Sequence, residues 1–297
     1  MPRELSKPRT DPFMTFDSHL HGASRANVSV FVMAYNEEVN LRRCLDSVAW
    51  SNDVVILDSH SQDRTVAIAN SYLNTRVFYH RFDDYSRQRN YGLHEIGYIN
   101  PWVLILDADE AVEPELSREI LDLVEQDPDI AVDVFLVRRK VVLDDRRITR
   151  NSTYDFWIER LLRPRAVHYE GTVHEKLVFE GGYRRLTAAI EHHQFAKGIP
   201  QWFERRLHYA RIEASGSSAQ PPIATILGDL FNRSTLVRRS ALKRIFNKLP
   251  YRWLIYLIYN LVVKLTFLDG VTGLRYVLLE SRSQYLQSRI RRIALGC

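Results

Sequence analysis

The segment from Trp102 to Glu110 reads WVLILDADE, with five apolar residues directly before a group of three carboxylates. An apolar run without polar alternation is typical of a strand that is buried on both faces of a parallel sheet. The carboxylates then lie at the carboxyl end of that strand, where open α/β sheets bind ligands. Asp107 and Asp109 can offer hard oxygen ligands to one Mg²⁺ or Mn²⁺. The same residues would also suit an acidic turn before a helix that begins near Glu113.

The composition is that of a globular chain. Its 297 residues are 45% hydrophobic, enough for one large domain or one domain with an appendage. Two cysteines, Cys44 and Cys297, can form neither a disulfide framework nor a zinc site. Cys44 falls on the apolar face of an expected helix, so we expect it in the core. Residues 1–26 lack an apolar segment, which predicts a flexible tail rather than a signal peptide.

The charge is divided unevenly along the chain. Residues 201–297 hold 16 Lys and Arg against 5 Asp and Glu, a net charge of +11, whereas the first 200 residues have a net charge of −6. This division predicts an acidic front half that uses a cation and a basic rear half that faces an anionic partner.

Strands and helices alternate ahead of the central segment. We expect strands at 28–32, 54–57 and 76–79, each followed by a helix, which predicts βαβ architecture with a parallel sheet. Asp58, just past the second strand, could accept hydrogen bonds from a ribose hydroxyl or a base N–H, or serve ordinary turn chemistry. The chain has neither a G-x-G-x-x-G nor a Walker motif, so side chains and a metal ion would have to hold a nucleotide.

Several motifs, in order, resemble family 2 glycosyltransferases, and more narrowly the bacterial subgroup that includes lipopolysaccharide-core glycosyltransferases. They lie at 30–40, 58–65, 88–91, 106–110, 160–163, 169–175 and 267–270. The resemblance implies an α/β GT-A fold, that of nucleotide-diphospho-sugar transferases, with a mostly parallel sheet. It also implies a metal-dependent reaction that inverts the anomeric carbon of a nucleotide-activated sugar.

The resemblance further implies roles for individual residues. Asp107 and Asp109 match the metal-diphosphate motif, and His174 would be a further metal ligand or a diphosphate contact. His192 and His193 could also touch the site. The base preference is left open, because His60, Gln62 and Arg64 replace residues that are usually smaller in the 58–65 loop. The residues expected to bind the nucleotide are Ala34, Tyr35, Asn36, Glu37, Asp58 and Arg89.

An inverting transfer needs a carboxylate that takes the proton of the acceptor hydroxyl while the metal stabilises the departing diphosphate. Glu175 is the first candidate for this base and Glu170 the second. The alternative is that His174 and Glu175 form only a surface strand pair. Asp155 and Glu159 are the next carboxylates to consider if neither candidate acts. Arg160 and Arg163 would meet anionic groups of the acceptor.

A linker-like stretch at 215–222 separates the predicted catalytic domain, 27–214, from a basic, apolar helical extension at 223–297. Its segment Trp253–Leu268 is about 16 residues long, short of the roughly 20 that a spanning helix needs. Arg252, Tyr256, Asn260 and Lys264 form one polar stripe. We therefore expect an interfacial helix with its cations on lipid phosphates, or else a helix packed on the domain or on a second subunit.

These features predict a peripheral protein on the cytoplasmic face of the inner membrane. It would move a sugar from a nucleotide-sugar, first of all a UDP-sugar, to a glycolipid or lipid-linked saccharide in cell-envelope or lipopolysaccharide synthesis. Two alternatives stay open: a GT-A nucleotidyltransferase that releases pyrophosphate, and a non-catalytic sugar-nucleotide-binding or membrane scaffold protein. Nucleic acid is not an expected partner, because no recognised binding motif accompanies the basic residues.

Overall fold

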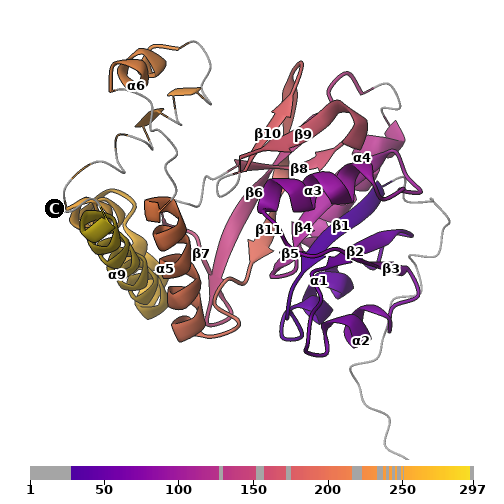
Figure 1. Ribbon diagram of the computed structural model, residues 1–297, viewed down its shortest axis with the longest axis horizontal. Coiled ribbons are helices and arrows are strands. Elements are labelled where there is room, and N and C mark those ends of the chain that lie inside the picture. The colour runs from indigo at the N-terminus through magenta and orange to yellow at the C-terminus, as the bar shows by residue number, and fades with distance from the viewer. Residues whose placement is uncertain are drawn as a thin grey trace, which may run out of the picture.

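The computed structural model describes residues 28–126, 130–151, 157–171, 175–215, 223–232, 237–238, 241–242, 245, 249 and 251–294. In this part of the chain, nine strands form one sheet in the order β3-β2-β1-β4-β8-β6-β11-β5, with β7 paired to β6 (Figure 1). Two more strands, β9 and β10, form an antiparallel hairpin. The strands are β1 Val28–Ala34, β2 Val54–Asp58, β3 Thr75–Tyr79, β4 Trp102–Asp107, β5 Glu110–Val112, β6 Val134–Leu143, β7 Arg146–Ile148, β8 Trp157–Leu162, β9 Val167–Glu170, β10 Lys176–Phe179 and β11 Tyr183–His192.

The sheet is parallel in its first half and mixed in its second. Strands β3, β2, β1 and β4 are mutually parallel, which confirms the βαβ prediction for this half. Beyond β4, strand β8 is antiparallel to β4 and β6, and β11 is parallel to β6 but antiparallel to β5. The prediction of a mostly parallel sheet is wrong here. The described residues from β6 to β11 contain no crossover α-helix, and antiparallel neighbours need none.

Helices cover both faces of the parallel half. On one face α1, α2 and α4 pack against side chains such as Val30 and Leu104, and Cys44 lies in this core as expected. On the other face α3 packs against Phe31 and Ile105. The central strand β4 is therefore buried on both faces, as its sequence predicts. The helices of this region are α1 Leu41–Ser47, α2 Thr65–Ala69, α3 Tyr85–His94 and α4 Pro114–Gln126.

A close approach at Gly92 fixes the position of α3. A Cβ atom at this residue would lie 2.0 Å from the Phe31 ring, so only glycine lets the helix reach β1 at this distance. Asp84 caps the start of the helix, because its carboxylate accepts a hydrogen bond from the backbone N–H of Arg87 at 2.9 Å. The helix thereby presents its polar side chains near the carboxyl ends of β1 and β4.

The rear part of the chain shares a core with the sheet domain. An apolar cluster joins β6 and β7 to α5 (Ile199–Ser215) and α9 (Gly270–Ala294), and Figure 1 shows these two helices side by side. Arg206 of α5 pairs with Glu280 of α9 at 2.5 Å. The inner face of the predicted extension therefore packs on the domain. The cluster consists of Val141, Leu143, Ile148, Phe195, Trp202, Tyr276 and Val277.

The segment predicted as one apolar helix is broken. Helix α8 (Arg252–Ile258) runs into a π-helical turn, η3 (Tyr259–Val263), and a left-handed Leu265 then leads to the 3₁₀ turn η4 (Thr266–Asp269). No single helix among the described residues is long and apolar enough to cross a membrane. The pair 252–263 and 266–293, bent by 71°, meets that test by length and composition alone.

The polar stripe of this segment faces the protein. Arg252 and Asn260 are buried, whereas Val262 and Val263 are 67% and 62% exposed. Arg252 reaches Gln287 of α9 at 3.4 Å, and the Asn260 amide donates to the backbone of its own helix. The prediction that Arg252 faces lipid phosphates is therefore wrong. Docking on α9 buries the polar side of the segment and leaves the apolar side outside.

The flexible tail predicted at 1–26 and most of the predicted linker lie outside the described residues. The described residues also form a short helix, α6 (Ile223–Leu230), and a 3₁₀ turn, η2 (Pro164–Ala166). The division into domains at 214 and 223 stays a prediction.

Candidate active site

Three strands end side by side at one edge of the sheet. Ala34 of β1 pairs with Asp58 of β2, and Met33 of β1 pairs with Asp107 of β4. The carboxylates of the Asp58 loop and of the segment after β4 therefore lie on the two sides of the loop that follows β1. This arrangement agrees with the ligand-binding edge expected for parallel strands.

Asp107 lies between two arginines. Its Oδ1 is 3.0 Å from Nη2 of Arg89, and its Oδ2 is 2.9 Å from Nη2 of Arg160. Burial alone would raise the pKa of this carboxyl, but Arg160 and Arg89 outweigh burial and hold the pKa far below its usual range. The Asp107 side chain is still 31% exposed, so the ionised carboxylate can be reached from outside.

Asp109 faces the end of β11 and helix α5. Its Oδ2 lies 3.5 Å from Nε2 of His192 and 3.6 Å from Nη1 of Arg205. Burial raises the pKa of Asp109, but His192 and Arg205 together bring it down to about 2. The backbone N–H of His193 also donates to the carbonyl of Asp109 at 2.8 Å. The expectation that His192 touches the site agrees with this position.

The loop after β1 and the Asp58 loop are joined by hydrogen bonds. The backbone N–H groups of Asn36 and Glu37 donate to the hydroxyls of Ser61 and Thr65 at 2.8 and 2.7 Å. Asp58 is buried, and its two oxygens accept from the backbone N–H and the hydroxyl of Ser61. This is the turn chemistry that the sequence left open, so the nucleotide role of Asp58 stays a prediction.

The other predicted nucleotide residues differ in accessibility. Ala34 is buried at the strand end, whereas Tyr35 beside it is 56% exposed and is available to a planar ligand. Glu37 is occupied: Nζ of Lys197 lies 2.6 Å from its Oε1, and the amide of Asn40 donates to its Oε2 at 2.8 Å. Burial raises the pKa of Glu37, which Asn40 and Lys197 only partly offset.

The two candidate bases lie in different surroundings. Glu175 is 23% exposed, and its Oε1 is 3.4 Å from Nε of Arg89, the same arginine that contacts Asp107. Glu170 is 65% exposed and pairs with His168 at 3.0 Å on the surface of the hairpin. Only Glu175 is thus brought to the carboxylate cluster. Asp155 and the predicted metal ligand His174 lie outside the described residues.

Neither arginine that was assigned to the acceptor lies open at this edge. Arg160 is buried, and its Nη2 is 2.7 Å from Oε1 of Glu110 as well as close to Asp107. It therefore neutralises two carboxylates and has no free face for an acceptor. Arg163 contacts Asp133 at 3.1 Å and stacks over Trp102, at the opposite end of β4. The structure therefore does not bring Arg160 and Arg163 together on an open surface, and their role toward the acceptor stays a prediction.

Lys197 and Arg205 are site residues that the sequence did not assign. Both come from the segment that leads into and forms α5, and each contacts a carboxylate of the edge. Tyr209, one turn after Arg205, meets the hydroxyl of Tyr85 at the start of α3. The sequence marks α5 as a basic, aromatic helix, but only the fold brings it across the carboxyl edge.

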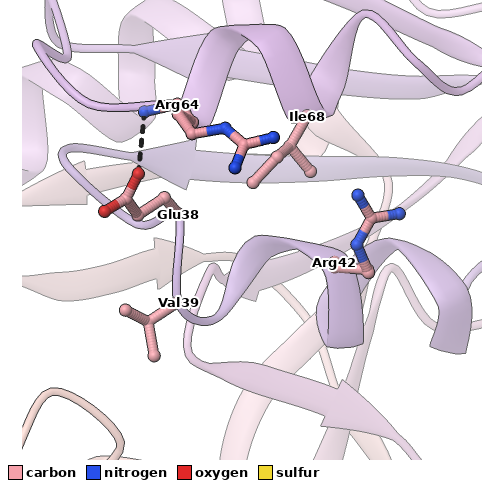
Figure 2. A pocket seen from close by; sticks show the side chains of 5 residues that line it. All are labelled: Glu38, Val39, Arg42, Arg64 and Ile68. Atoms are coloured by element: carbon pink, nitrogen blue, oxygen red, sulfur yellow. Dashed lines mark hydrogen bonds between the residues drawn. The ribbon is translucent and has the colours of Figure 1, made fainter.

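A pocket lies between α1 and α2, beside the loops that follow β1 and β2. Figure 2 shows its lining residues, Glu38, Val39, Arg42, Arg64 and Ile68. Its one carboxylate already accepts a hydrogen bond from the backbone N–H of Arg64 at 3.1 Å, the dashed line in Figure 2. None of the carboxylates at the ends of the strands lines this pocket, so it lies apart from the carboxylate cluster at the edge of the sheet.

Residues 29–186 match the model of the family described as Glycosyl transferase family 2, and the chain belongs to this family. Together with the strand order, this assignment supports the expected GT-A fold, here with a mixed sheet and helices on both faces. The resemblance found in the sequence motifs is thereby confirmed at the level of the family.

Curated relatives match over part of their length. The lipopolysaccharide core biosynthesis glycosyltransferase LpsC of Rhizobium meliloti (strain 1021) is 29% identical over 160 residues, 52% of this chain and 58% of the relative. The uncharacterized glycosyltransferase RC0292 of Rickettsia conorii is 36% identical over 94 residues, 31% of this chain and 32% of the relative. The chain thus spans between a third and somewhat over half of these relatives.

Solved structures also show some likeness to this chain. TarS 1-349 of S. aureus has a TM-score of 0.44 and 16% identity, over 89% of this chain and 91% of that one. Glucosyl-3-phosphoglycerate synthase of Mycobacterium tuberculosis, in complex with Mn²⁺, uridine-diphosphate and glucosyl-3-phosphoglycerate, has a TM-score of 0.34 and 15% identity, over 46% of this chain and 57% of that one.

Proposed function

We propose that this chain transfers a sugar from a nucleotide-sugar, first of all a UDP-sugar, to a glycolipid or lipid-linked saccharide. The observation that carries the proposal is the meeting of Asp107, Asp109 and Glu175 with cationic side chains at one edge of the sheet. Membership of a glycosyl transferase family supports sugar transfer as the reaction. The name of the relative LpsC supports the lipopolysaccharide core as the acceptor.

The carboxylates at this edge fit a divalent cation that would also bind the phosphates of the nucleotide-sugar. Among the described residues, no group of three or more His, Cys, Asp or Glu is arranged to hold a metal ion. Mg²⁺, however, is commonly bound by one or two carboxylates and takes its other ligands from phosphate and water. Asp107 and Asp109 would supply these carboxylates, with His174 as a further candidate. Such a cation would stabilise the negative charge of the departing diphosphate.

The chain's own residues would hold the rest of the donor. Tyr35 is exposed beside the strand end, where its ring could stack on the base. Lys197 and Arg205 are the cations that a diphosphate would meet on the α5 side of the edge. The guanidinium of Arg89 faces the carboxylates of Asp107 and Glu175, and its role toward the nucleotide stays a prediction.

Glu175 would act as the general base. It would accept the proton of the acceptor hydroxyl while that oxygen bonds to the anomeric carbon and the bond from this carbon to the diphosphate breaks. The leaving group is a nucleoside diphosphate, and attack from the opposite side inverts the configuration. Replacing Glu175 by Gln should lower kcat by about a hundred- to ten-thousand-fold. Glu170→Gln is the matched control in the same hairpin, and normal turnover by Glu175→Gln would remove this residue from the role.

The acceptor side is proposed to lie at a membrane. Large apolar side chains are exposed around the bend between α8 and α9, while the polar stripe of α8 faces the protein. Helix α9 also carries five arginines against one glutamate, which favours an anionic lipid surface. These features support a peripheral protein on the cytoplasmic face of the inner membrane, where a lipid-linked acceptor would be presented.

Product analysis tests the reaction. The full chain is incubated with Mn²⁺, a panel of UDP- and GDP-sugars, and either truncated lipopolysaccharide or lipid-linked saccharides. We expect release of a nucleoside diphosphate that needs both donor and acceptor, and that is lost in Asp109→Asn but kept in the control Asp83→Asn. Release of pyrophosphate would identify a nucleotidyltransferase instead. Donor binding without turnover on any acceptor would favour a scaffold protein.

A further inference from the structure

We propose that Arg89 is a positioning residue that sets the base Glu175 against the carboxylate Asp107, and so couples the acceptor side of the site to the donor side. The inference rests on the proposed function. One guanidinium contacts both groups: Nη2 lies 3.0 Å from Oδ1 of Asp107, and Nε lies 3.4 Å from Oε1 of Glu175. Among the described residues, no other side chain forms ion pairs with both carboxylates.

The guanidinium itself is held in place. Arg89 is 6% exposed, and its Cζ lies 5.3 Å from the centre of the Tyr169 ring. Burial and this stacking restrict the side chain, and the planar group fixes the direction of each N–H donor. The fork holds Asp107 by a hydrogen bond and attracts Glu175 by an ion pair, so its fixed plane favours one placement of the two carboxylates relative to each other. A flexible ammonium group would attract both of them without fixing either.

Helix α3 also holds the hairpin that carries Glu175. The side-chain amide of Asn90 donates to the carbonyl of Tyr169 at 2.8 Å and accepts from the N–H of the same residue at 2.7 Å. The hydroxyl of Ser86 donates to the carbonyl of Gly171. Arg89 follows Ser86 by three residues and Asn90 follows it by four, so all three lie on one face of α3. This face therefore fixes the hairpin backbone and the Glu175 side chain together.

The consequence concerns the rate of transfer more than the affinity for the donor. A general base must lie within hydrogen-bond reach of the proton that it takes. A misplacement of about 1 Å can cost roughly a hundredfold in rate. Loss of Arg89 would leave Asp107 still paired with Arg160, so the donor carboxylate keeps one of its two cations. Among the described residues, Glu175 forms an ion pair with no cationic side chain other than Arg89.

A double-mutant cycle of Arg89→Gln, Glu175→Gln and the double variant tests this role. For each protein we would measure kcat, the donor KM, the Mn²⁺-dependent UDP affinity and the melting temperature. We expect Arg89→Gln to lower kcat by about a hundredfold. The donor KM should change by less than about tenfold, because Glu175 acts on the acceptor and Asp107 keeps Arg160 as its second partner. In the Glu175→Gln background the same substitution should cost less than about threefold, because a positioning residue acts only through the group it positions.

Two further variants distinguish the effect of the planar guanidinium from the effect of its charge and from a general loss of stability. Arg89→Lys keeps the charge but not the planar fork, so we expect it to stay at least about tenfold below the wild type in kcat. It also replaces Arg89→Gln in the cycle if that variant does not fold. Arg87→Gln, an exposed arginine of the same helix, should have normal kcat and melting temperature.

The outcomes separate this inference from the proposed function. The positioning role would be overturned if the loss of kcat in the double variant equalled the product of the losses in the two single variants. Wild-type kcat in Arg89→Lys would also overturn it. Normal kcat in Arg89→Gln together with a strong loss in Glu175→Gln would overturn it while leaving the proposed base intact. Normal kcat in Glu175→Gln would remove the base and this inference together.

Discussion

The ammonium nitrogen of Lys197 lies 2.6 Å from a carboxylate oxygen of Glu37, 160 residues away in sequence. This ion pair joins the segment before α5 to the loop after β1. Arg205 makes a second contact of this kind, to Asp109 at 3.6 Å. The basic helix α5 is therefore attached to the acidic edge of the sheet by two pairs of opposite charge, and it closes the site on that side.

Removal of the Lys197 charge should destabilise the fold. Both side chains of the pair are mostly buried, and Glu37 keeps only an amide partner when the ammonium is gone. We expect Lys197→Met to lower the free energy of unfolding by about 1–3 kcal/mol, the cost of leaving a buried polar group poorly paired. Urea denaturation followed by circular dichroism measures this change.

The pair has a neutral counterpart and a surface control. In Lys197→Met/Glu37→Gln the uncompensated charge is absent, so part of the lost stability should return. Lys176→Met, at an exposed position of β10, should change the free energy of unfolding by less than about 0.5 kcal/mol. Equal stability of Lys197→Met and the wild type would mean that this ion pair does not hold the segment to the loop.

Asp109→Asn should weaken metal-dependent donor binding while the chain stays folded. The substitution removes one oxygen charge from the proposed cation site but keeps the size of the side chain, so packing is little changed. We expect UDP affinity in the presence of Mn²⁺ to fall by more than about tenfold, within the range known for changes around metal sites. Isothermal titration calorimetry measures it, and Glu115→Gln, at an exposed position of α4, is the control. Unchanged affinity in folded Asp109→Asn would exclude this carboxylate from the donor site.

The sequence predicts the parallel half of the sheet because its signals are local. An apolar run such as Val103 to Leu106 is typical of a strand that is buried on both faces, and the carboxylates that follow such a strand lie at its end. The positions of Asp107 and Asp109 at the carboxyl edge are therefore confirmed. Their roles as metal ligands stay predictions.

Pairings between distant residues are not visible in the sequence. Arg160 follows Trp157-Ile158-Glu159 in a strand, and nothing local indicates that its partners are Asp107 and Glu110, some 50 residues earlier. The stripe that includes Arg252 and Asn260 is likewise visible as a periodicity. Which face is buried depends on α9, because that helix supplies polar partners such as Gln287.

Asp269 should prove to be an anchor between the rear helices and the sheet domain. Its carboxylate accepts hydrogen bonds from the backbone N–H groups of Thr149 and Arg150 at 2.9 and 2.7 Å, and from the hydroxyl of Thr149 at 2.7 Å. We expect Asp269→Ala to lower the free energy of unfolding by about 1–3 kcal/mol, since it removes three hydrogen bonds to a charged acceptor.

The control for this anchor is Asp144→Asn. Asp144 pairs with Arg275 of α9, but both side chains are about half exposed, and exposed pairs contribute about 0–1 kcal/mol. The two variants therefore test whether the rear helices are held by the Asp269 hydrogen bonds or by surface charge. A larger loss of stability in Asp144→Asn than in Asp269→Ala would mean that the Asp269 hydrogen bonds are not what holds the rear helices.

The apolar side chains around the bend between α8 and α9 should bind a lipid surface. We expect the full chain to cosediment with vesicles that contain anionic lipid. Val262→Asp should lower the vesicle-bound partition at least about tenfold, because burial of one valine contributes about 1.5–3 kcal/mol and a carboxylate opposes burial. The matched control is Leu73→Asp, which places the same charge at an exposed apolar position between α2 and β3 and should leave cosedimentation unchanged. Binding should also weaken as salt rises, because the arginines of α9 act near the headgroups.

If Val262→Asp and the wild type partition equally, or if the full chain stays in the supernatant at low salt, the bend does not bind lipid. A concentration-dependent dimer in the wild type that Val262→Asp abolishes would assign the apolar face to a second copy of the chain instead.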